Sequence, residues 1–380
     1  MNLEEKLISL RRELHQHPEL SGEEFQTTQK LTTWLKEAGI RILPYDLKTG
    51  VVAEIGHGAP VIALRADIDA LPIEENSEAV CPSLEKGKMH ACGHDFHATV
   101  LLGAALLLKQ NESRLVGTVR LFFQPAEENY SGALQLIKAG VLKDVDVIFG
   151  FHNAPKMPVG EFGTCHGAIM ANVDRFEINL AGVGAHAAYP ENGTDVIVAA
   201  SEIINSLQTI VSRNISSHDS AIVSVTRINA GSGWNILPEK AELEGTVRTF
   251  DASIRKEIQR RMRDLVYYLA KAMDVGAQFL WHEGPPAVIN TPYWSDFSAK
   301  IARQFGYVTH NVTPQNGGED FAHYLHHRPG VFFHIGTGSP QSLHHPGFNI
   351  DEKAIFPAAE YYALLAEEAL KDLKNTQASA

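Results

Sequence analysis

Two amphipathic helices are predicted at the start of the chain by the spacing of its apolar residues. Leucines recur every three or four positions from Leu3 to His17, and a similar periodicity runs from Phe25 to Ala38 and stops at Gly39. Short apolar runs then alternate with helical stretches, an order typical of a largely parallel sheet covered by helices. The strands of this sheet are expected at Val61 to Arg65, Thr118 to Phe123, Val145 to Phe151 and Val331 to Ile335.

The middle of the chain has a pattern of its own. Half-buried strands are separated there by two helical stretches, which suits a small α+β domain. Since 380 residues exceed the size at which one hydrophobic core stops growing, we expect two domains. We predict a main α/β domain in two parts, residues 1–174 and 290–380, and a smaller α+β domain inserted at 175–289. The elements of the inserted domain are expected at Phe176 to Leu180, Val196 to Arg213, Ala221 to Ile228, Ala241 to Thr249 and Ser253 to Met273.

Composition and charge narrow the class of protein. With 44% hydrophobic and 21% charged residues, the chain has the composition of a globular protein. Its 45 acidic residues outnumber its 33 lysines and arginines, and the net charge of -12 disfavours a nucleic-acid partner. Three cysteines cannot close a disulfide framework and the first residues are charged, so we expect a cytoplasmic protein. The most apolar stretch, Val100 to Leu108, is about half the length that crosses a bilayer, which predicts a buried helix and no membrane partner.

Reactive side chains follow the predicted strands at their carboxyl ends. In an open α/β sheet, ligands bind in the crevice beyond these ends, so three segments should contribute to one site. The residues concerned are Asp67 and Asp69 after the first strand, Glu127 and Glu128 after the second, and His152 after the third.

The densest group of reactive side chains is the segment HACGHDFH at residues 90–97. It holds a thiol, three imidazoles and a carboxylate, which are the common protein ligands of zinc and related divalent ions. The alternative is a buried cysteine beside a helix whose N-terminus is capped by Asp95. A lone buried cysteine needs no histidine neighbours, so the segment favours a metal site.

A second group is the carboxylate pair in QPAEE. Adjacent residues after a strand point in different directions, so one carboxylate can bind metal while the other faces a substrate. Glu127 is the candidate general base and Glu128 the candidate metal ligand. For an isolated pair, a solvated helix N-terminus would be the simpler interpretation, since acidic residues suit the helix dipole there.

Seven motifs give the chain a resemblance to a known family. In their order and spacing they resemble the aminoacylase and carboxypeptidase superfamily of metallohydrolases, over almost the whole chain. The branch concerned holds hippurate hydrolases, auxin-conjugate amidohydrolases and N-acetyl-diaminopimelate deacetylases. The motifs are MHACGHDFH, FFQPAEE, GFHN, GVGAHAAYP, GWNILPEKAELEGTVRTF, GGEDF and SLHHPGF.

The resemblance implies a catalytic main domain that holds two divalent ions, with zinc, manganese, cobalt and nickel all compatible. Glu127 is then the base that activates water and protonates the leaving amine, and Asp67 orients a ligating imidazole. For the last ligand, His345 beside His344 is the alternative. The implied ligands are Cys92, which bridges the two ions, and His94, Glu128, His152 and His344.

The same resemblance gives the inserted domain the role of a lid and dimerisation unit, and therefore predicts a homodimer. His186 and Asn235 match residues that polarise the scissile carbonyl, within one subunit or across the dimer, and Arg248 matches the residue that holds a substrate carboxylate. The predicted activity is metal-dependent hydrolysis of the amide bond of N-acyl, foremost N-acetyl, amino acids. A dipeptidase or carboxypeptidase with the same two-metal site is the alternative, and a non-catalytic binder would not need Glu127.

Overall fold

The chain is divided into two compact units. The computed structural model describes residues 2–77 and 79–379. One unit is formed from both ends of the sequence, and the other is inserted into it. The first unit comprises Met1–Ile169, Ile289–Thr313 and Asp320–Ala380, and the second comprises Met170–Val288 and Pro314–Glu319.

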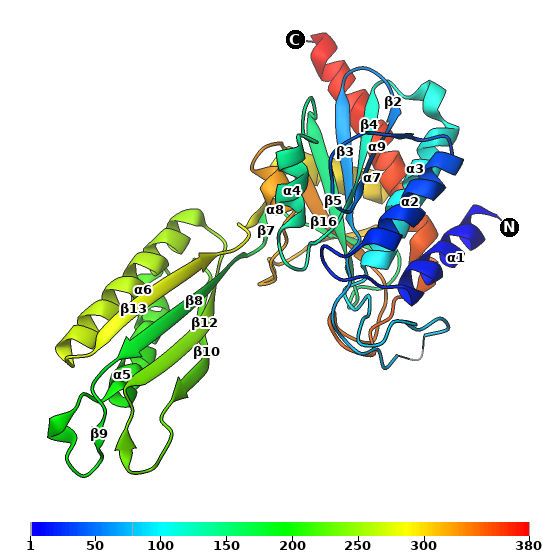
Figure 1. The fold of residues 1–380 in the computed structure, drawn as a ribbon. Coiled ribbons are helices and arrows are strands. Elements are labelled where there is room, and N and C mark those ends of the chain that lie inside the picture. The colour runs from blue at the N-terminus through cyan, green and yellow to red at the C-terminus, as the bar shows by residue number, and fades with distance from the viewer. Residues whose placement is uncertain (1, 78, 380) are drawn as a thin grey trace. The chain divides into compact units, whose positions relative to one another are not determined.

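An eight-stranded sheet forms the centre of the first unit (Figure 1). Its strands, in spatial order, are β1 (Arg41–Ile42), β2 (Val51–Gly56), β4 (Thr118–Gln124), β3 (Val61–Asp67), β5 (Val147–Ala154), β16 (Gly330–Gly336), β6 (Glu161–Thr164) and β15 (Val308–Asn311). The four central strands, β4, β3, β5 and β16, run parallel to one another. Antiparallel pairs join β1 to β2, β2 to β4 and β16 to β6.

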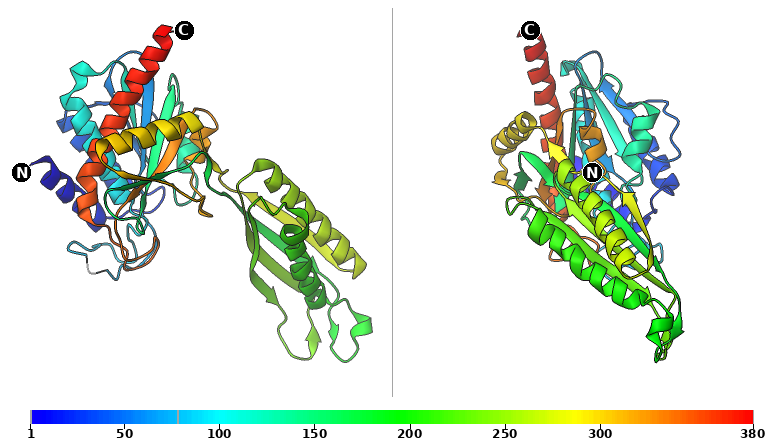
Figure 2. Two further views of the ribbon diagram at one scale, coloured as in Figure 1. Left: turned by 180° about the vertical axis from the view of Figure 1, so that it is seen from behind. Right: turned by 90° about the vertical axis from the view of Figure 1, so that its left-hand side faces the viewer.

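Helices cover this sheet, which explains why its central strands are apolar along their whole length. Every residue of β3, β4 and β16 is buried, as expected for parallel strands with both faces covered. Seen from behind, α7 (Pro292–Phe305) and α9 (Ile355–Ser379) lie in front of the sheet (Figure 2). The other helices are α1 (Leu3–Gln16), α2 (Phe25–Glu37), α3 (His94–Gln110), α4 (Gly132–Ala139) and α8 (Ala322–Leu325).

The apolar stretch predicted as a buried helix lies in α3, and this prediction is confirmed. All residues from His94 to Ala105 are buried. Gly103 lies where α1 and α9 approach this helix, since a Cβ there would lie 2.7 Å from both the Leu7 Cδ1 and the Ala359 Cβ. Close packing on two sides fixes the position of α3, and its first residue, His94, is a candidate metal ligand. Within the described residues, no helix combines the length and apolarity needed to span a membrane.

The second unit is an antiparallel sheet with helices on one face (Figure 1). Buried and more exposed residues alternate along β12, which is the pattern of a strand with one covered face. In spatial order the strands are β10 (Ala221–Ala230), β12 (Lys240–Thr249), β8 (Asn172–Ala181) and β13 (Gly276–Glu283). The helices are α5 (Val196–Thr209) and α6 (Ala252–Ala272), and a two-stranded ribbon joins β9 (Ala185–His186) to β11 (Ile236–Leu237).

Where the chain passes from one unit to the other, β7 (Gly167–Met170) pairs with β14 (Val288–Asn290). The predicted fold class is confirmed: a helix-covered, mostly parallel sheet carries an inserted α+β unit. Antiparallel strands at both sides of the sheet are an addition that the sequence pattern did not predict.

Candidate active site

Five side chains with metal-binding atoms lie together at the carboxyl ends of the central strands. They form two groups of three that share one cysteine, and the ligand atoms within each group lie within 4.8 Å of one another. The groups are Cys92, His94 and His152, and Cys92, Glu128 and His344. The structure therefore brings together all five side chains that the sequence analysis named as ligands.

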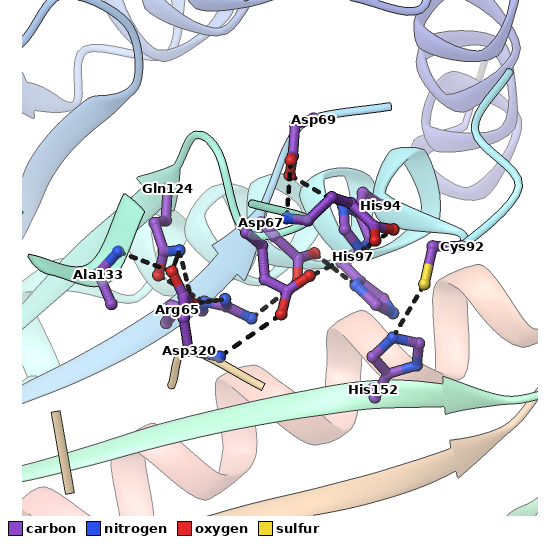
Figure 3. A network of polar contacts seen from close by, with 12 residues as sticks. Arg65, Asp67, Asp69, Cys92, His94, His97, Gln124, Ala133, His152 and Asp320 are labelled. Carbon is purple, nitrogen blue, oxygen red and sulfur yellow. Dashed lines mark hydrogen bonds and ion pairs between the residues drawn. The ribbon is translucent and has the colours of Figure 1, made fainter. Parts of the chain in front are cut away.

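The ligand atoms of this cluster lie close to one another. Cys92 Sγ lies 3.4 Å from the His152 Nε2 (Figure 3). Glu128 Oε1 lies 3.9 Å from the His94 Nε2 and 3.4 Å from the His344 Nε2. Strand β5 supplies His152 and the start of α3 supplies His94, so packed secondary structure holds two of the ligands.

The donor set fits divalent cations. His94 Nε2 and Glu128 Oε1 are buried, and neither atom has a hydrogen-bond partner among the described residues. Burial alone would lower the pKa of His94, but the carboxylates of Asp67 and Asp69 outweigh it and raise the pKa to about 10. Burial and the nearby Glu128 carboxylate raise the pKa of the Cys92 thiol well above its ordinary value. Negative charge thus surrounds two buried atoms that have no hydrogen-bond partner among the described residues, and such an environment favours a cation.

Gly93 allows the chain to present Cys92 and His94 on either side of it. Its φ of 87° is in the left-handed region, and a Cβ there would lie 2.5 Å from the Asn153 Nδ2. The Asn153 amide donates to the Cys92 carbonyl at 2.6 Å, which ties this turn to β5. Any larger residue at position 93 would force apart the segments that carry three of the five ligands.

Between the two adjacent C-terminal histidines, the geometry separates their roles. His344 has a φ of 63°, and its backbone N–H donates to the Ala91 carbonyl at 2.8 Å. This conformation brings its ring near Glu128. The His345 Nδ1 instead accepts the Gly347 N–H at 2.9 Å within its own turn. Such strained backbone at a cluster of polar groups is common at functional sites.

Only one of the three imidazoles in HACGHDFH belongs to the cluster. Both nitrogens of His97 are engaged, because Nδ1 lies 2.6 Å from the Asp67 Oδ1 and Nε2 accepts the Asn153 N–H at 2.9 Å. His90 is buried, and neither of its ring nitrogens has a hydrogen-bond partner among residues 2–77 and 79–379. Burial lowers the pKa of His90 to about 4, so its ring is neutral. His90 has no role that the structure explains.

Asp67 was expected to orient a ligating imidazole, but the structure gives this contact to Asp69. The Asp69 Oδ1 lies 3.1 Å from the His94 Nδ1. Asp67 instead forms its short contacts with His97 and Arg65, and its Oδ2 is 3.7 Å from the His94 Nε2. Asp69 also accepts the Glu128 N–H at 3.0 Å, so one carboxylate positions two candidate ligands. The sequence analysis named both aspartates of RADIDA as reactive residues, but it gave the orienting role to the first of them.

Asp95 is not the N-cap residue of α3, which is Gly93, although its Oδ1 accepts the Phe96 N–H in the first turn at 2.9 Å. The Asp95 carboxylate lies 2.8 Å from the Arg11 Nε and 2.7 Å from the His15 Nδ1. Burial of Asp95 is offset by these two basic groups, which lower its pKa well below the ordinary value. This buried ion pair attaches α1 to the start of α3.

The other carboxylate of the pair, Glu127, faces a buried polar network. Its Oε1 lies 3.4 Å from the backbone N–H of Asp320, a residue of the GGEDF motif. The Asp320 side chain accepts from Arg65 and from Gln124, both at 2.8 Å (Figure 3). Burial raises the pKa of Asp320 to about 6, although Arg65 opposes the shift. Glu127 therefore contacts Asp320 and also lies beside the ligand cluster, because its carboxylate has an oxygen within 4.8 Å of ligand atoms of His94 and Glu128.

The remaining candidates lie in the inserted unit. His186 of β9 and Asn235, which directly precedes β11, line one cavity of about 810 Å³. The Ala187 N–H donates to the Asn235 carbonyl beside the pairing of these two strands. Arg248 lies apart from them on β12, opposite Val173 and Ile222. It is half-buried, and no carboxylate of the described residues lies within ion-pair distance of it.

Comparisons with known proteins agree with this geometry. Residues 63–368 match the family described as Peptidase family M20/M25/M40. The chain is 47% identical over 372 residues to the N-acetylcysteine deacetylase of Bacillus subtilis, covering 97% of this chain and 98% of that protein. It is 37% identical over 375 residues to thermostable carboxypeptidase 1 of Saccharolobus solfataricus, with 96% and 95% covered. Among solved structures, the Bacillus subtilis YXEP protein, described as a dinuclear metal binding peptidase from M20 family, matches with a TM-score of 0.88 and 44% identity, covering 97% of this chain and 99% of that one.

We expect Asp69→Ala to lower the free energy of unfolding by about 2 to 4 kcal/mol, because it leaves buried donors on Glu128 and Ser21 without an acceptor. Urea denaturation of the purified variant measures the change. Ser21→Ala is the matched control, since it removes a single contact of Asp69 and should cost about 1 kcal/mol or less. Equal losses in the two variants would contradict the positioning role of Asp69.

Proposed function

The chain belongs to the peptidase family M20/M25/M40, and we propose that it hydrolyses the amide bond of N-acyl, foremost N-acetyl, amino acids. The products are a carboxylate and a free amino acid. The observation that carries this proposal is the clustering of five ligand side chains, with the Glu127 carboxylate next to two of them, His94 and Glu128. The 47% identity to a deacetylase over almost the whole chain supports an acyl group as the part removed.

Two divalent ions per subunit are the proposed cofactors, with Cys92 shared between them. Two of the groups, one with His94 and His152 and the other with Glu128 and His344, have Cys92 in common, so its thiolate would be a ligand available to both ions. When bound, the ions supply Lewis acidity and make a water molecule acidic enough to attack near neutral pH. Zinc, manganese, cobalt and nickel all accept thiolate, imidazole and carboxylate together.

Glu127 is the proposed general base. Its carboxylate lies within 4.8 Å of ligand atoms of His94 and Glu128, close enough to exchange protons with a water molecule beside them. In the forward reaction it takes a proton from the attacking water and then gives it to the departing amine. Without this proton the amine would have to leave as an anion, which is a poor leaving group. The Asp320 backbone N–H holds this carboxylate in place, and the side chain of Asp320 is itself held by Arg65.

The inserted unit is proposed to bind the substrate. An imidazole and a side-chain amide can both donate to a developing oxyanion, and His186 and Asn235 line one cavity. Arg248 is proposed to hold the substrate α-carboxylate, because it is half-buried and its guanidinium suits bidentate pairing. A carboxypeptidase activity is the second candidate. It is favoured by the 37% identity to such an enzyme and uses the same carboxylate contact.

Glu127→Gln should reduce kcat on the best substrate by about 10² to 10⁴-fold and leave the metal content unchanged, because Glu127 handles protons and binds no ion. The substrate is first identified by screening N-acetyl and N-benzoyl amino acids and dipeptides with added Mn²⁺ or Zn²⁺. Turnover of dipeptides alone would favour the carboxypeptidase. Unchanged activity in the variant would refute the assignment of the base.

Arg248→Ala should reduce kcat/KM by about two to three orders of magnitude on an N-acyl amino acid, since loss of a charge-assisted bidentate pair costs a few kcal/mol. On the matching N-acyl amino acid amide, the variant and the wild type should differ little. Arg227→Ala is the control, because Arg227 is already paired with Glu242 and Glu244. Equal losses on acid and amide would show that Arg248 has no carboxylate to hold.

A homodimer formed through the inserted unit is proposed as the assembly. The unit exposes large apolar side chains on α6, including Tyr268, which is 73% exposed. Light scattering at micromolar concentration should give twice the mass of one chain. Tyr268→Glu should shift the protein toward monomer, whereas Leu134→Glu, at an exposed apolar position of the first unit, should not. A wild-type protein that is monomeric throughout would overturn the proposal.

A further inference from the structure

A buried carboxylate lies behind the turn that carries Glu127 and Glu128. Glu24, at the N-terminus of α2, is fully buried, and no basic group of the described residues lies within ion-pair distance of it. Its Oε1 accepts the Gly22 N–H at 2.9 Å and the Ala126 N–H at 2.8 Å. Its Oε2 accepts the Thr49 hydroxyl at 2.8 Å. A charge buried with neutral donors alone is unfavourable, and burial raises the pKa of Glu24. The burial of the Glu24 carboxyl therefore needs an explanation.

The partner of Glu24 is the strained residue of the turn. Ala126 has a φ of 54°, in the left-handed region that a side chain disfavours. Its N–H is held by Glu24, and its carbonyl accepts the N–H groups of Ser131 and Gly132 at 3.2 and 3.1 Å. Ala126 directly precedes Glu127, so its conformation sets the direction in which both glutamates leave β4. The hydrogen bond that Glu24 accepts from the Ala126 N–H holds the turn in a conformation that is unfavourable for alanine.

Other residues of α2 and of the loop before β2 also support the turn that contains Ala126. The Thr28 hydroxyl donates to the Glu24 carbonyl at 2.6 Å and accepts the Gly50 N–H at 2.8 Å. A Cβ on Gly50 would lie 2.7 Å from the Pro125 Cδ, so the loop packs directly on the turn. The turn is thus held by a side chain and by close packing, while no hydrogen bond or ion pair within the described residues joins Glu24 to a proposed ligand.

We infer that Glu24 is a positioning residue for the reaction: its hydrogen bond to Ala126 holds the turn that aims Glu127 at the reacting groups and Glu128 at the metal ions. The inference rests on the proposed function of these two glutamates. Residues that orient metal ligands typically change metal affinity or activity by 10- to 100-fold when they are removed, and we expect about that size here. A purely structural role for Glu24 would lower stability and leave both quantities unchanged.

The test is a double-mutant cycle of Glu24→Ala with Ala126→Gly in the full-length protein. Glu24→Ala should lower kcat and the affinity for Mn²⁺, measured by calorimetry, by about 10- to 100-fold, with little change in KM. Glycine adopts a positive φ without strain, so in the Ala126→Gly background the losses should shrink by about tenfold. Asp274→Gly is the matched control, because Asp274 has the same φ of 54° in the inserted unit and should give no such recovery.

Two further variants make the outcome independent of whether Glu24→Ala folds. Glu24→Gln keeps an oxygen for both N–H groups and an amide that can donate to the Thr49 oxygen, so it should retain most activity. Glu24→Asp keeps the charge but is too short to reach Ala126, and it should behave like Glu24→Ala. Wild-type kcat and Mn²⁺ affinity in Glu24→Asp and Glu24→Ala, or losses that are equal in both backgrounds, would overturn the inference. If the wild type hydrolysed no N-acyl substrate, the proposed function would fail, while the Mn²⁺ affinities would still decide the role of Glu24.

Discussion

Buried negative charge at the carboxyl ends of the central strands is the constraint on which the first unit depends. Asp67, Asp69 and Asp320 are fully or almost fully buried, and each would be costly there without partners. Arg65 offsets part of this charge by contacting Asp67 and Asp320 at 2.7 and 2.8 Å. The remainder converges on His94, whose raised pKa records the same attraction for positive charge that a metal ion would experience. The buried carboxylates therefore both order this polar network and favour the binding of cations beside it.

Apolar packing supplies the rigidity that this charge requires. Helix α3 is buried from its first turn, and its N-terminal residues are held by Gly93 against Asn153 and by Asp95 against Arg11. On a mobile loop, mutual repulsion would separate clustered carboxylates. Here the strands and α3 fix the position of each carboxylate. Catalytic geometry of this kind depends on such preorganisation, because the polar groups need not rearrange during the reaction.

The sequence predicted those features that depend on local pattern and on motif spacing. The family identified from the motifs is confirmed, and the five proposed ligands do lie together. The choice between Asp67 and Asp69 could not be made in this way, because it depends on which aspartate faces His94 across the start of α3. Likewise, HACGHDFH offers three imidazoles, and only the fold shows that Asp67 and Asn153 occupy both nitrogens of His97. Glu24 was missed because an acidic residue before a helix looks like an ordinary surface residue until its burial is known.

The burial of Cys92 has a consequence for chemical labelling of the native protein. Thiolates, not thiols, attack electrophiles, and burial raises the pKa of both Cys92 and Cys165 above the ordinary value. Cys81 is the one cysteine that is partly exposed, in the loop between Leu71 and Met89. A maleimide dye or spin label added to the unmodified chain should therefore attach at a single position and leave the donor set of the active site untouched. The protein could then be studied with a spectroscopic label at one defined position without any engineered cysteine.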